Sequence, residues 1–167
     1  SLLFYGGGDG RCYAFESRPA APVQPIKLST AWSYDCNPPE YKFRDGKLIG
    51  YYEGDKRKGN SPNKNDGQYV GPSQIIATPI FYGGRIYVSI GQDPAHGRGK
   101  GMLRCIDATK RGDVTKTGAI WTYDAIERSI STVAVADGLV YAGDIAGRLH
   151  CLDAQTGGEL WRYAPRD

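Results

Sequence analysis

The sequence predicts an all-β protein assembled from repeated units of four short antiparallel strands. The first observation is composition: of 167 residues, 23 are Gly, 10 are Pro and 12 are Tyr, a mixture that favours short strands and many turns. The second is the hydrophobic pattern, which has no persuasive helical period and instead shows apolar runs separated by glycine turns. The third is an internal repeat, and it decides the architecture.

Two motifs recur along the chain and define the repeat. The first reads Gly, any residue, an apolar residue or Cys, any residue, a small residue, an apolar residue and an acid, and it occurs at 10–16, 101–107 and 147–153. The second reads apolar residue, Trp, polar residue and Tyr. It occurs at 31–34, 120–123 and 160–163 and contains every Trp of the chain. Chance is a poor explanation for both, so we interpret them as one structural unit used repeatedly.

The last unit shows the strands most clearly. We expect strands at 130–136, 139–143, 148–153 and 159–163, with the first pair joined by Asp137-Gly138, a strong hairpin signal. The segments on either side of Gly83-Gly84 predict a second hairpin of the same kind. Four antiparallel strands repeating every 40–50 residues or so are typical of a β-propeller blade.

The units divide the chain into four parts: a partial blade that lacks its first strand at 1–34, an insertion or degenerate blade at 35–76, a full blade with long loops at 77–129 and a full blade at 130–167. A propeller ring closes with about 4–8 blades. About three blades therefore form a partial propeller, and we expect it to be part of a larger ring. The alternative is that copies of the chain assemble to complete one.

The third unit, at 139–161, strongly resembles the repeat of pyrroloquinoline-quinone-like (quinoprotein-type) β-propellers, and several phrases are similar to those of secreted, planctomycete-type members. Its Cys151, Asp153, Thr156, Gly157 and Trp161 resemble the tryptophan-docking motif of that family, with Cys where Ala is usual. The second unit matches at Cys105, Asp107, Gly118 and Trp121, with six extra residues in its turn. The first unit keeps Ala14, Glu16 and Trp32.

These residues also have a physical interpretation. A Trp near the end of an outer strand is a large apolar plate that can pack on the next blade. Asp and Thr-Gly set the turn by capping backbone groups and supplying a positive φ, and the small residue lies where blades press together. The predicted blade-docking residues are Trp32, Trp121, Trp161, Asp107, Asp153, Thr156, Gly157, Ala14, Cys105 and Cys151.

The resemblance raises the question of a cofactor. The family enzymes use a metal-bound quinone, a catalytic Asp, a stacking Trp and often a disulfide of adjacent Cys. This chain has no adjacent Cys, and its three Trp all occupy docking positions. We therefore expect no catalytic, cofactor-binding or metal-binding residues. The alternative is a part of a quinone (PQQ)-dependent dehydrogenase, with Ca²⁺, whose catalytic residues lie in missing blades.

Other chemistry is poorly supported. No Cys-x-x-Cys-His sequence offers haem attachment. His150 and Cys151 are neighbours on a strand and point to opposite faces, which disfavours a zinc site. A glycine-rich loop could bind an ion through Asp93, His96, Arg98 and Lys100, although a long exposed turn is the simpler interpretation.

The four Cys fall into two classes. Cys12 and Cys36 lie on or beside neighbouring strands, so a disulfide between them is possible and would suit an extracytoplasmic protein. Cys105 and Cys151 occupy equivalent places in successive units. We interpret these two as small buried thiols.

A net charge of +3 does not call for nucleic acid, and the basic run at 56–58 is not reinforced elsewhere. No run of 18 apolar residues predicts a membrane span. We expect a non-catalytic β-propeller segment that acts as a protein-interaction or assembly scaffold, periplasmic or secreted, with other protein chains or missing blades as partners. A weaker hypothesis is a carbohydrate- or surface-binding module that uses the Tyr-rich insertion.

Overall fold

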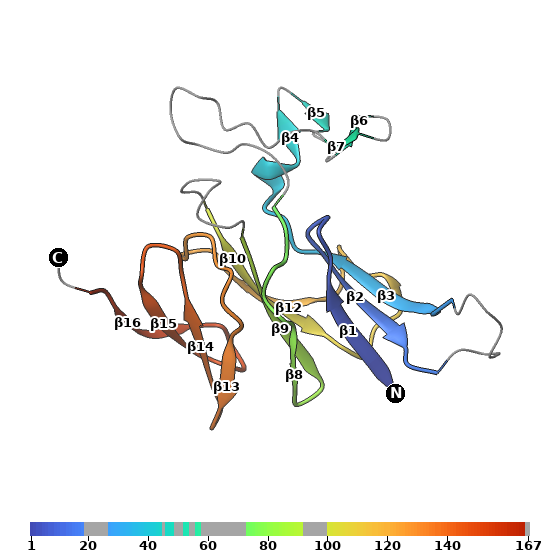
Figure 1. Cartoon of the computed structure of the whole chain (residues 1–167). Coiled ribbons are helices and arrows are strands. Elements are labelled where there is room, and N and C mark those ends of the chain that lie inside the picture. The colour runs from blue at the N-terminus through green and yellow to red at the C-terminus, as the bar shows by residue number, and fades with distance from the viewer. Residues whose placement is uncertain are drawn as a thin grey trace.

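Three four-stranded sheets stand side by side and account for most of the described chain (Figure 1). The computed structural model describes residues 1–18, 27–44, 46–48, 52–53, 56–57, 73–91 and 100–165. We call the sheets blades 1, 2 and 3 in chain order. No helix among these residues is long and apolar enough to cross a membrane.

Blades 2 and 3 are each formed by four antiparallel strands, and each strand bonds the next strand of its own blade. Blade 2 contains β8 (Ile80–Tyr82), β9 (Arg85–Ile90), β10 (Met102–Asp107) and β12 (Ala119–Tyr123). Blade 3 contains β13 (Ala134–Ala136), β14 (Leu139–Gly143), β15 (Leu149–Asp153) and β16 (Glu159–Tyr163).

Blade 1 is built differently. Its own strands are β1 (Leu2–Gly6), β2 (Arg11–Glu16) and β3 (Thr30–Asp35), and its fourth is β11 (Gly112–Asp113), which pairs in parallel with β3. β11 comes from the turn of blade 2 that carries six extra residues, a segment whose sequence predicts only a longer turn. That turn therefore extends the outer edge of the neighbouring sheet.

The segment between blades 1 and 2 contributes only small elements in its described parts. They are a 3-10 helix, η1 (Pro39–Tyr41), and two-residue strands that form two pairs: β4 (Phe43–Arg44) with β5 (Lys47–Leu48), and β6 (Tyr52–Glu53) with β7 (Lys56–Arg57). They lie above the blades in Figure 1.

The hairpin turns follow the predicted chemistry. Gly83 and Gly84 have φ of 57° and 77°, and Asp137 and Gly138 have φ of 52° and 77°. Two successive positive φ values are the geometry of the two-residue turn whose twist matches antiparallel strands. Asp137 is the one residue other than Gly with positive φ in the described chain, a position that Asp tolerates better than most residues.

The first strand of blade 3 is shorter than the sequence predicted. It begins at Ala134 rather than at 130 because the preceding residues run between blades 2 and 3. The amide of Ser129 donates to Ile90 O of blade 2, and the carbonyl of Arg128 accepts from Ile145 N of blade 3. The backbone of this segment therefore bonds both neighbouring blades.

The hydrophobic core lies between blades and forms two clusters. One is formed by residues of blades 1 and 2, including Trp32, Ile86 and Val88. The other is formed by residues of blades 2 and 3, including Trp121 and Leu152. A single blade has no core of its own, so each sheet depends on its neighbour for burial of apolar area.

Candidate functional site: the inter-blade surfaces

Two of the three Trp make the same contact with the following blade. Trp32 on β3 of blade 1 is fully buried, and its indole N–H donates to Ala108 O of blade 2 at 3.2 Å. Trp121 on β12 is 8% exposed, and its N–H donates to Ala154 O of blade 3 at 3.1 Å. Each indole thus combines a large buried apolar area with one directional bond to the next sheet.

The backbone beneath each Trp is also repeated. Ala14, Cys105 and Cys151 lie directly opposite Trp32, Trp121 and Trp161, and the strand register shifts immediately after the small residue in each case. A shift at this point is a β-bulge, which bends the strand. All three small residues are fully buried, so a larger side chain would meet closely packed atoms.

The acceptor carbonyl sits at the start of an Asp-capped turn. In blade 3, Asp153 Oδ1 accepts bonds from Gln155 N, Thr156 N and Thr156 Oγ1 at 2.7–2.9 Å. In blade 2, Asp107 Oδ1 accepts from the amide and hydroxyl of Thr109. These bonds favour the ionised form and lower the pKa of both carboxyl groups. The turn is therefore a rigid platform for the indole N–H.

Gly157 lets Trp121 approach the platform closely. A Cβ at Gly157, where φ is 73°, would lie 2.6 Å from Trp121 Cδ2, which is far inside normal contact. The sequence motif identified Gly157 only as a turn residue. The structure adds that it is the surface on which the indole of the preceding blade rests.

We expect Gly157→Ala to lower the free energy of unfolding by about 2–4 kcal/mol, since it combines left-handed strain with a clash against a packed ring. Gly147→Ala is the matched control, because Gly147 has φ of 78° but a Cβ there would meet only Pro165 Cγ at 3.5 Å. Urea unfolding of both variants measures the difference. Equal losses would mean that the contact with Trp121 contributes nothing.

Trp161 differs from the other two. It is 45% exposed and contacts Tyr141 of its own blade, with ring centroids 6.1 Å apart. The outer strand around it is exposed throughout. The open face of blade 3 therefore presents an apolar and aromatic surface whose exposed members are Leu149, Leu160, Trp161 and Tyr163.

The opposite end of the stack is also open. Leu3 and Tyr5 on β1 are 51% and 55% exposed, and Tyr13 and Phe15 on β2 stack with ring centroids 5.8 Å apart. Since buried faces of neighbouring blades carry the same kinds of residue, both ends have the character of inter-blade surfaces.

A buried polar chain crosses the interface between blades 2 and 3. Asp144 and His150 side chains are 0% exposed, with Asp144 Oδ2 3.0 Å from His150 Nε2. His150 Nδ1 lies 3.0 Å from the hydroxyl of Tyr123 in blade 2, which in turn donates to Glu159. Burial and the bond to Glu159 raise the pKa of Tyr123 to about 12, so the phenol stays protonated.

The sequence did not predict this set of hydrogen-bonded polar side chains. It considered His150 only as a metal ligand paired with Cys151, and the two neighbours do serve different contacts. The available signal was the Asp that opens the turn at Asp144 with His six residues later. Nothing in the sequence indicated that Tyr123, in another unit, would complete the chain.

The turn that contains β11 joins blades 1 and 2 through a backbone hydrogen bond and an ion pair, and we call this turn the clasp. Val114 N donates to Ser33 O at 2.9 Å, and Arg11 Nη2 lies 2.8 Å from Asp113 Oδ2. Bonds from Thr115 lower the pKa of Asp113 to about 2. Beside the clasp is a charged hollow of about 530 Å³, lined by Arg11, Asp35, Lys42, Asp113, Thr115, Lys116 and Thr117.

The predicted disulfide partners lie close together as buried free thiols. Burial and the neighbouring Cys36 raise the pKa of the Cys12 thiol, and burial raises the pKa of Cys36 to about 12. The bond between them stays a prediction. Cys105 and Cys151 are also buried free thiols.

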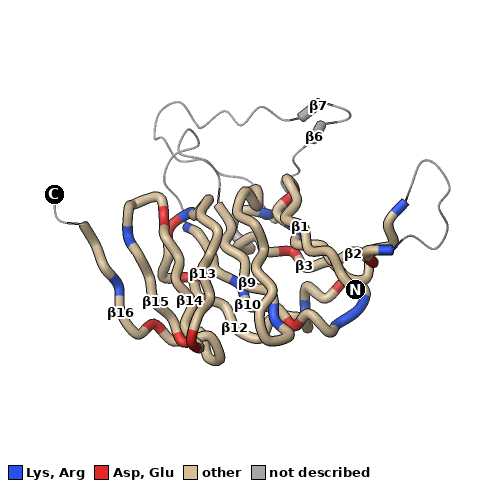
Figure 2. The backbone as a smooth tube through the Cα atoms, turned by 60° about the horizontal axis from the view of Figure 1, so that its bottom comes forward, with Lys and Arg blue, Asp and Glu red and all other residues tan. Residues whose placement is uncertain are grey.

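The predicted ligand loop falls mostly outside the described residues: Asp93, His96 and Arg98 belong to that part. Lys100 is described, and its ammonium lies 3.4 Å from Asp124 Oδ2. Within the described ranges, no three His, Cys, Asp or Glu side chains lie where they could hold a metal ion. Lys or Arg and Asp or Glu occur in all three blades, as Figure 2 shows.

Comparison with known proteins places these features in a family context. Residues 99–167 match the family described as outer membrane protein assembly factor BamB. The crystal structure of BamB from Moraxella catarrhalis superposes with a TM-score of 0.59 at 16% identity, over 97% of this chain and 34% of that one. No curated protein matches the sequence.

A europium-containing methanol dehydrogenase superposes with a TM-score of 0.55 at 12% identity, over 99% of this chain and 23% of the enzyme. The chain therefore spans about a third of the first structure and less than a quarter of the second. At these identities the likeness shows a shared fold. The sheets described above are blades of that fold, which the sequence had predicted.

Proposed function

Because the chain is a PQQ-like β-propeller repeat protein, we propose that it is a non-catalytic propeller segment that acts as a protein-interaction or assembly scaffold outside the cytoplasm. The matching family is described by a role in outer membrane protein assembly, which supports both protein partners and an extracytoplasmic location. Such a segment binds by presenting blade surfaces to other blades or chains.

One observation carries the proposal. Trp32 and Trp121 each donate to a carbonyl of the following blade, whereas Trp161 occupies the same register position with its indole half exposed. The surface around Trp161 therefore supports a contact of the same kind with a further blade or with another protein chain. Its partner is a protein surface with an apolar face and an acceptor carbonyl at an Asp-capped turn.

The enzymatic alternative has weaker support in the described residues. A metal-bound quinone needs metal ligands gathered at one place, and within the described ranges no three His, Cys, Asp or Glu side chains are gathered in that way. Trp32 and Trp121 are committed to inter-blade bonds, so neither is available to stack on a quinone.

Sedimentation of the purified chain tests the scaffold proposal, since the outward faces of blades 1 and 3 both expose large apolar side chains. We expect concentration-dependent association that Trp161→Glu reduces at least tenfold. Ile120→Glu is the control, because Ile120 is also exposed, at 41%, but lies on the outer strand of blade 2. A chain that stays monomeric, or that responds equally to both substitutions, contradicts the proposal.

A separate experiment tests the dehydrogenase alternative. Reduction of a dye by the chain after addition of PQQ and Ca²⁺ would favour that alternative.

A further inference from the structure

The hydrogen-bond partners of His150 determine which of its ring nitrogens carry hydrogen. The imidazole is buried between blades 2 and 3, with Nε2 3.0 Å from Asp144 Oδ2 and Nδ1 3.0 Å from the hydroxyl oxygen of Tyr123. A neutral imidazole offers one donor and one acceptor, whereas an imidazolium offers two donors. The form that fits therefore depends on whether Asp144 and Tyr123 can donate to the ring.

The partner of Nε2 can only accept. Burial alone would raise the pKa of Asp144, but bonds from His150 and from the amides of Arg148 and Glu127 lower it below 3.8. Asp144 is therefore an ionised carboxylate at neutral pH, and a carboxylate has no hydrogen to donate. The hydrogen of the bond between Asp144 and His150 must lie on Nε2.

The partner of Nδ1 has already used its hydrogen. The hydroxyl of Tyr123 has one hydrogen and donates it to Glu159, whose pKa is lowered by the bonds from Arg162 and Tyr123. Arg162 Nη2 also donates to the Tyr123 oxygen, at 3.5 Å. The oxygen therefore presents only lone pairs to His150, and Nδ1 must donate. With hydrogen on both nitrogens, His150 is an imidazolium.

The charges around His150 balance when it is an imidazolium. The charged side chains bonded to or paired within this cluster are Glu127, Asp144, Arg148, Glu159 and Arg162. Three of them are acids and two are Arg, so a protonated His150 supplies the third positive charge. Arg128 of the connecting segment lies instead over the ring of Tyr41, 5.1 Å from its centroid, and Asp124 pairs with Lys100.

The interface between blades 1 and 2 has a cation at the equivalent position. Arg104 and His150 share one register position, directly before the small residue of the docking motif. The guanidinium of Arg104 lies 5.8 Å from the ring centroid of Tyr34. Tyr34 and Tyr123 both come two residues after the docking Trp of the preceding blade. A cation that faces the Tyr of the preceding blade is therefore a repeated feature.

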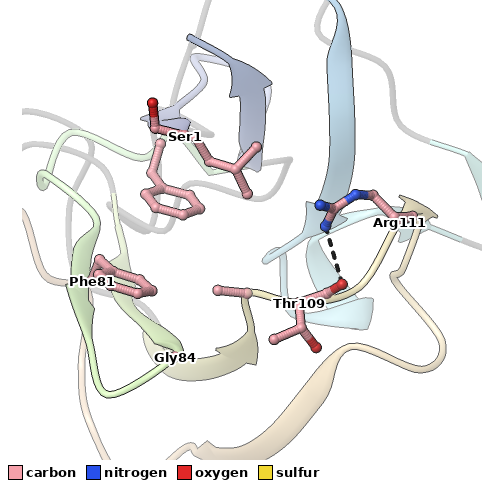
Figure 3. A pocket seen from close by; sticks show the side chains of 8 residues that line it. Ser1, Phe81, Gly84, Thr109 and Arg111 are labelled. Carbon is pink, nitrogen blue, oxygen red and sulfur yellow. Dashed lines mark hydrogen bonds between the residues drawn. The ribbon is translucent and has the colours of Figure 1, made fainter.

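The two interfaces differ in whether this cation can lose its proton. Arg is not deprotonated in proteins, whereas His releases a proton near neutral pH. Arg111, beside the cavity of about 520 Å³ between blades 1 and 2, is likewise an Arg and donates to Thr109 O at 3.1 Å (Figure 3). The charges of Arg104 and Arg111 therefore stay constant with pH, while that of His150 does not.

We propose that His150 makes the contact between blades 2 and 3 dependent on pH: as an imidazolium it bonds both Asp144 and Tyr123, and release of one proton to water weakens the contact. Asp144 retains the hydrogen on Nε2, so the proton leaves from Nδ1. The hydroxyl of Tyr123 can then donate to His150 or to Glu159 but not to both, and one buried bond between the blades is lost. This contact lies within the chain and does not depend on the scaffold proposal.

Nitrogen-15 NMR of the chain with labelled His measures the protonation directly. The chain has 2 His, so His96→Gln leaves only the ring signals of His150. We expect hydrogen on both ring nitrogens at about pH 7, where about three in four ordinary His side chains are neutral. At higher pH the hydrogen on Nδ1 should be lost while that on Nε2 is kept. A neutral ring at pH 7, or loss from Nε2, would overturn the inference.

Urea unfolding between pH 6 and pH 8 measures the consequence for stability. A proton that the folded chain holds more tightly than the unfolded chain stabilises the fold in full below about pH 6.5, and this contribution is lost as pH rises through the range in which folded His150 releases it. We expect the ratio of folded to unfolded chain to fall about tenfold between about pH 6 and pH 8.

Two Tyr variants assign this pH dependence to the interface between blades 2 and 3. Tyr123→Phe removes the acceptor of Nδ1 and should abolish most of the fall. Tyr34→Phe is the matched control at the interface that uses Arg104, and it should retain the fall in full. An equal fall in both variants would contradict the proposal.

Hydrogen exchange of the unmodified chain provides a test that needs no variant to fold. Ile145 N donates to Arg128 O beside blade 3, and Gly91 N makes the equivalent bond to Gln74 O beside blade 2. After correction for the intrinsic effect of pH on exchange, protection of Ile145 should fall as His150 loses its proton, while protection of Gly91 stays constant. A loss at both amides, or at neither, would overturn the inference.

Discussion

Trp32→Ala is expected to lower the free energy of unfolding by about 3–5 kcal/mol, the range for removal of a large buried aromatic side chain. Trp32 is fully buried in the cluster between blades 1 and 2 and bonds Ala108 O. Truncation therefore leaves a cavity and an unpaired carbonyl at the same place. Chemical denaturation followed by far-UV circular dichroism measures the loss.

Trp161→Ala is the matched control, since it removes the same side chain from the equivalent register position. Trp161 is 45% exposed and has only Tyr141 as an aromatic neighbour. At concentrations where the chain is monomeric, its loss should cost no more than about 1 kcal/mol. Comparable losses for the two variants would show that the Trp do not act through contacts between blades.

The repeat made the architecture predictable. The bulge and the opposed Trp recur because the same residues recur, so each unit carries the information for its own sheet and for its contact with the next. Asp137-Gly138 and Gly83-Gly84 gave the hairpins for a local reason: only a few residues tolerate two successive positive φ values. These features depend on sequence neighbours and need no knowledge of distant segments.

Features that depend on departures from the repeat were not predictable. The extra residues of the blade 2 turn form β11 and add a fourth strand to the sheet of blade 1, a pairing of segments about eighty residues apart. Their sequence, rich in Thr, Gly and charge, is that of an ordinary exposed loop. Two residues are too few to show the alternating pattern of a strand, so β11 is recognised only from its pairing with β3 in the structure.

The buried polar chain illustrates the same limit. Asp144, His150 and Tyr123 are each common residue types for a strand or turn, and no motif spacing joins the third to the first two. What joins them is the packing of blade 3 on blade 2, which removes all three from water and leaves each needing a partner. The buried polar side chains of one blade thus depend on the neighbouring blade for their hydrogen-bond partners.

Removal of one member of this chain should be costly. We expect Asp144→Ala to lower the free energy of unfolding by about 3–5 kcal/mol, because it leaves His150 Nε2 and several backbone amides without their hydrogen-bond partner. The same carboxylate accepts from the amides of Ala146 and Arg148 through one oxygen and of Glu127 through the other. Asp144→Asn keeps one accepting oxygen and should lose about half as much, so the three proteins should rank in order of acceptors retained.

The dependence of the free energy of unfolding on pH in the acid range provides a second measurement. Burial alone would raise the pKa of Asp144, but bonds from His150 and from the amides of Arg148 and Glu127 lower it below the usual 3.8. A carboxyl whose pKa is lower in the folded than in the unfolded chain stabilises the protein above the unfolded value, and that stability is lost as pH falls through the folded value. Asp144→Asn should therefore flatten the fall in stability below about pH 4.

Asp124→Ala is the control, because it removes an exposed ion pair with Lys100. It should cost less than about 1 kcal/mol and leave the fall in stability at acid pH unchanged. If Asp144→Asn loses stability at acid pH as steeply as the unmodified protein, the loss arises from other carboxyl groups, such as Asp113 in the clasp.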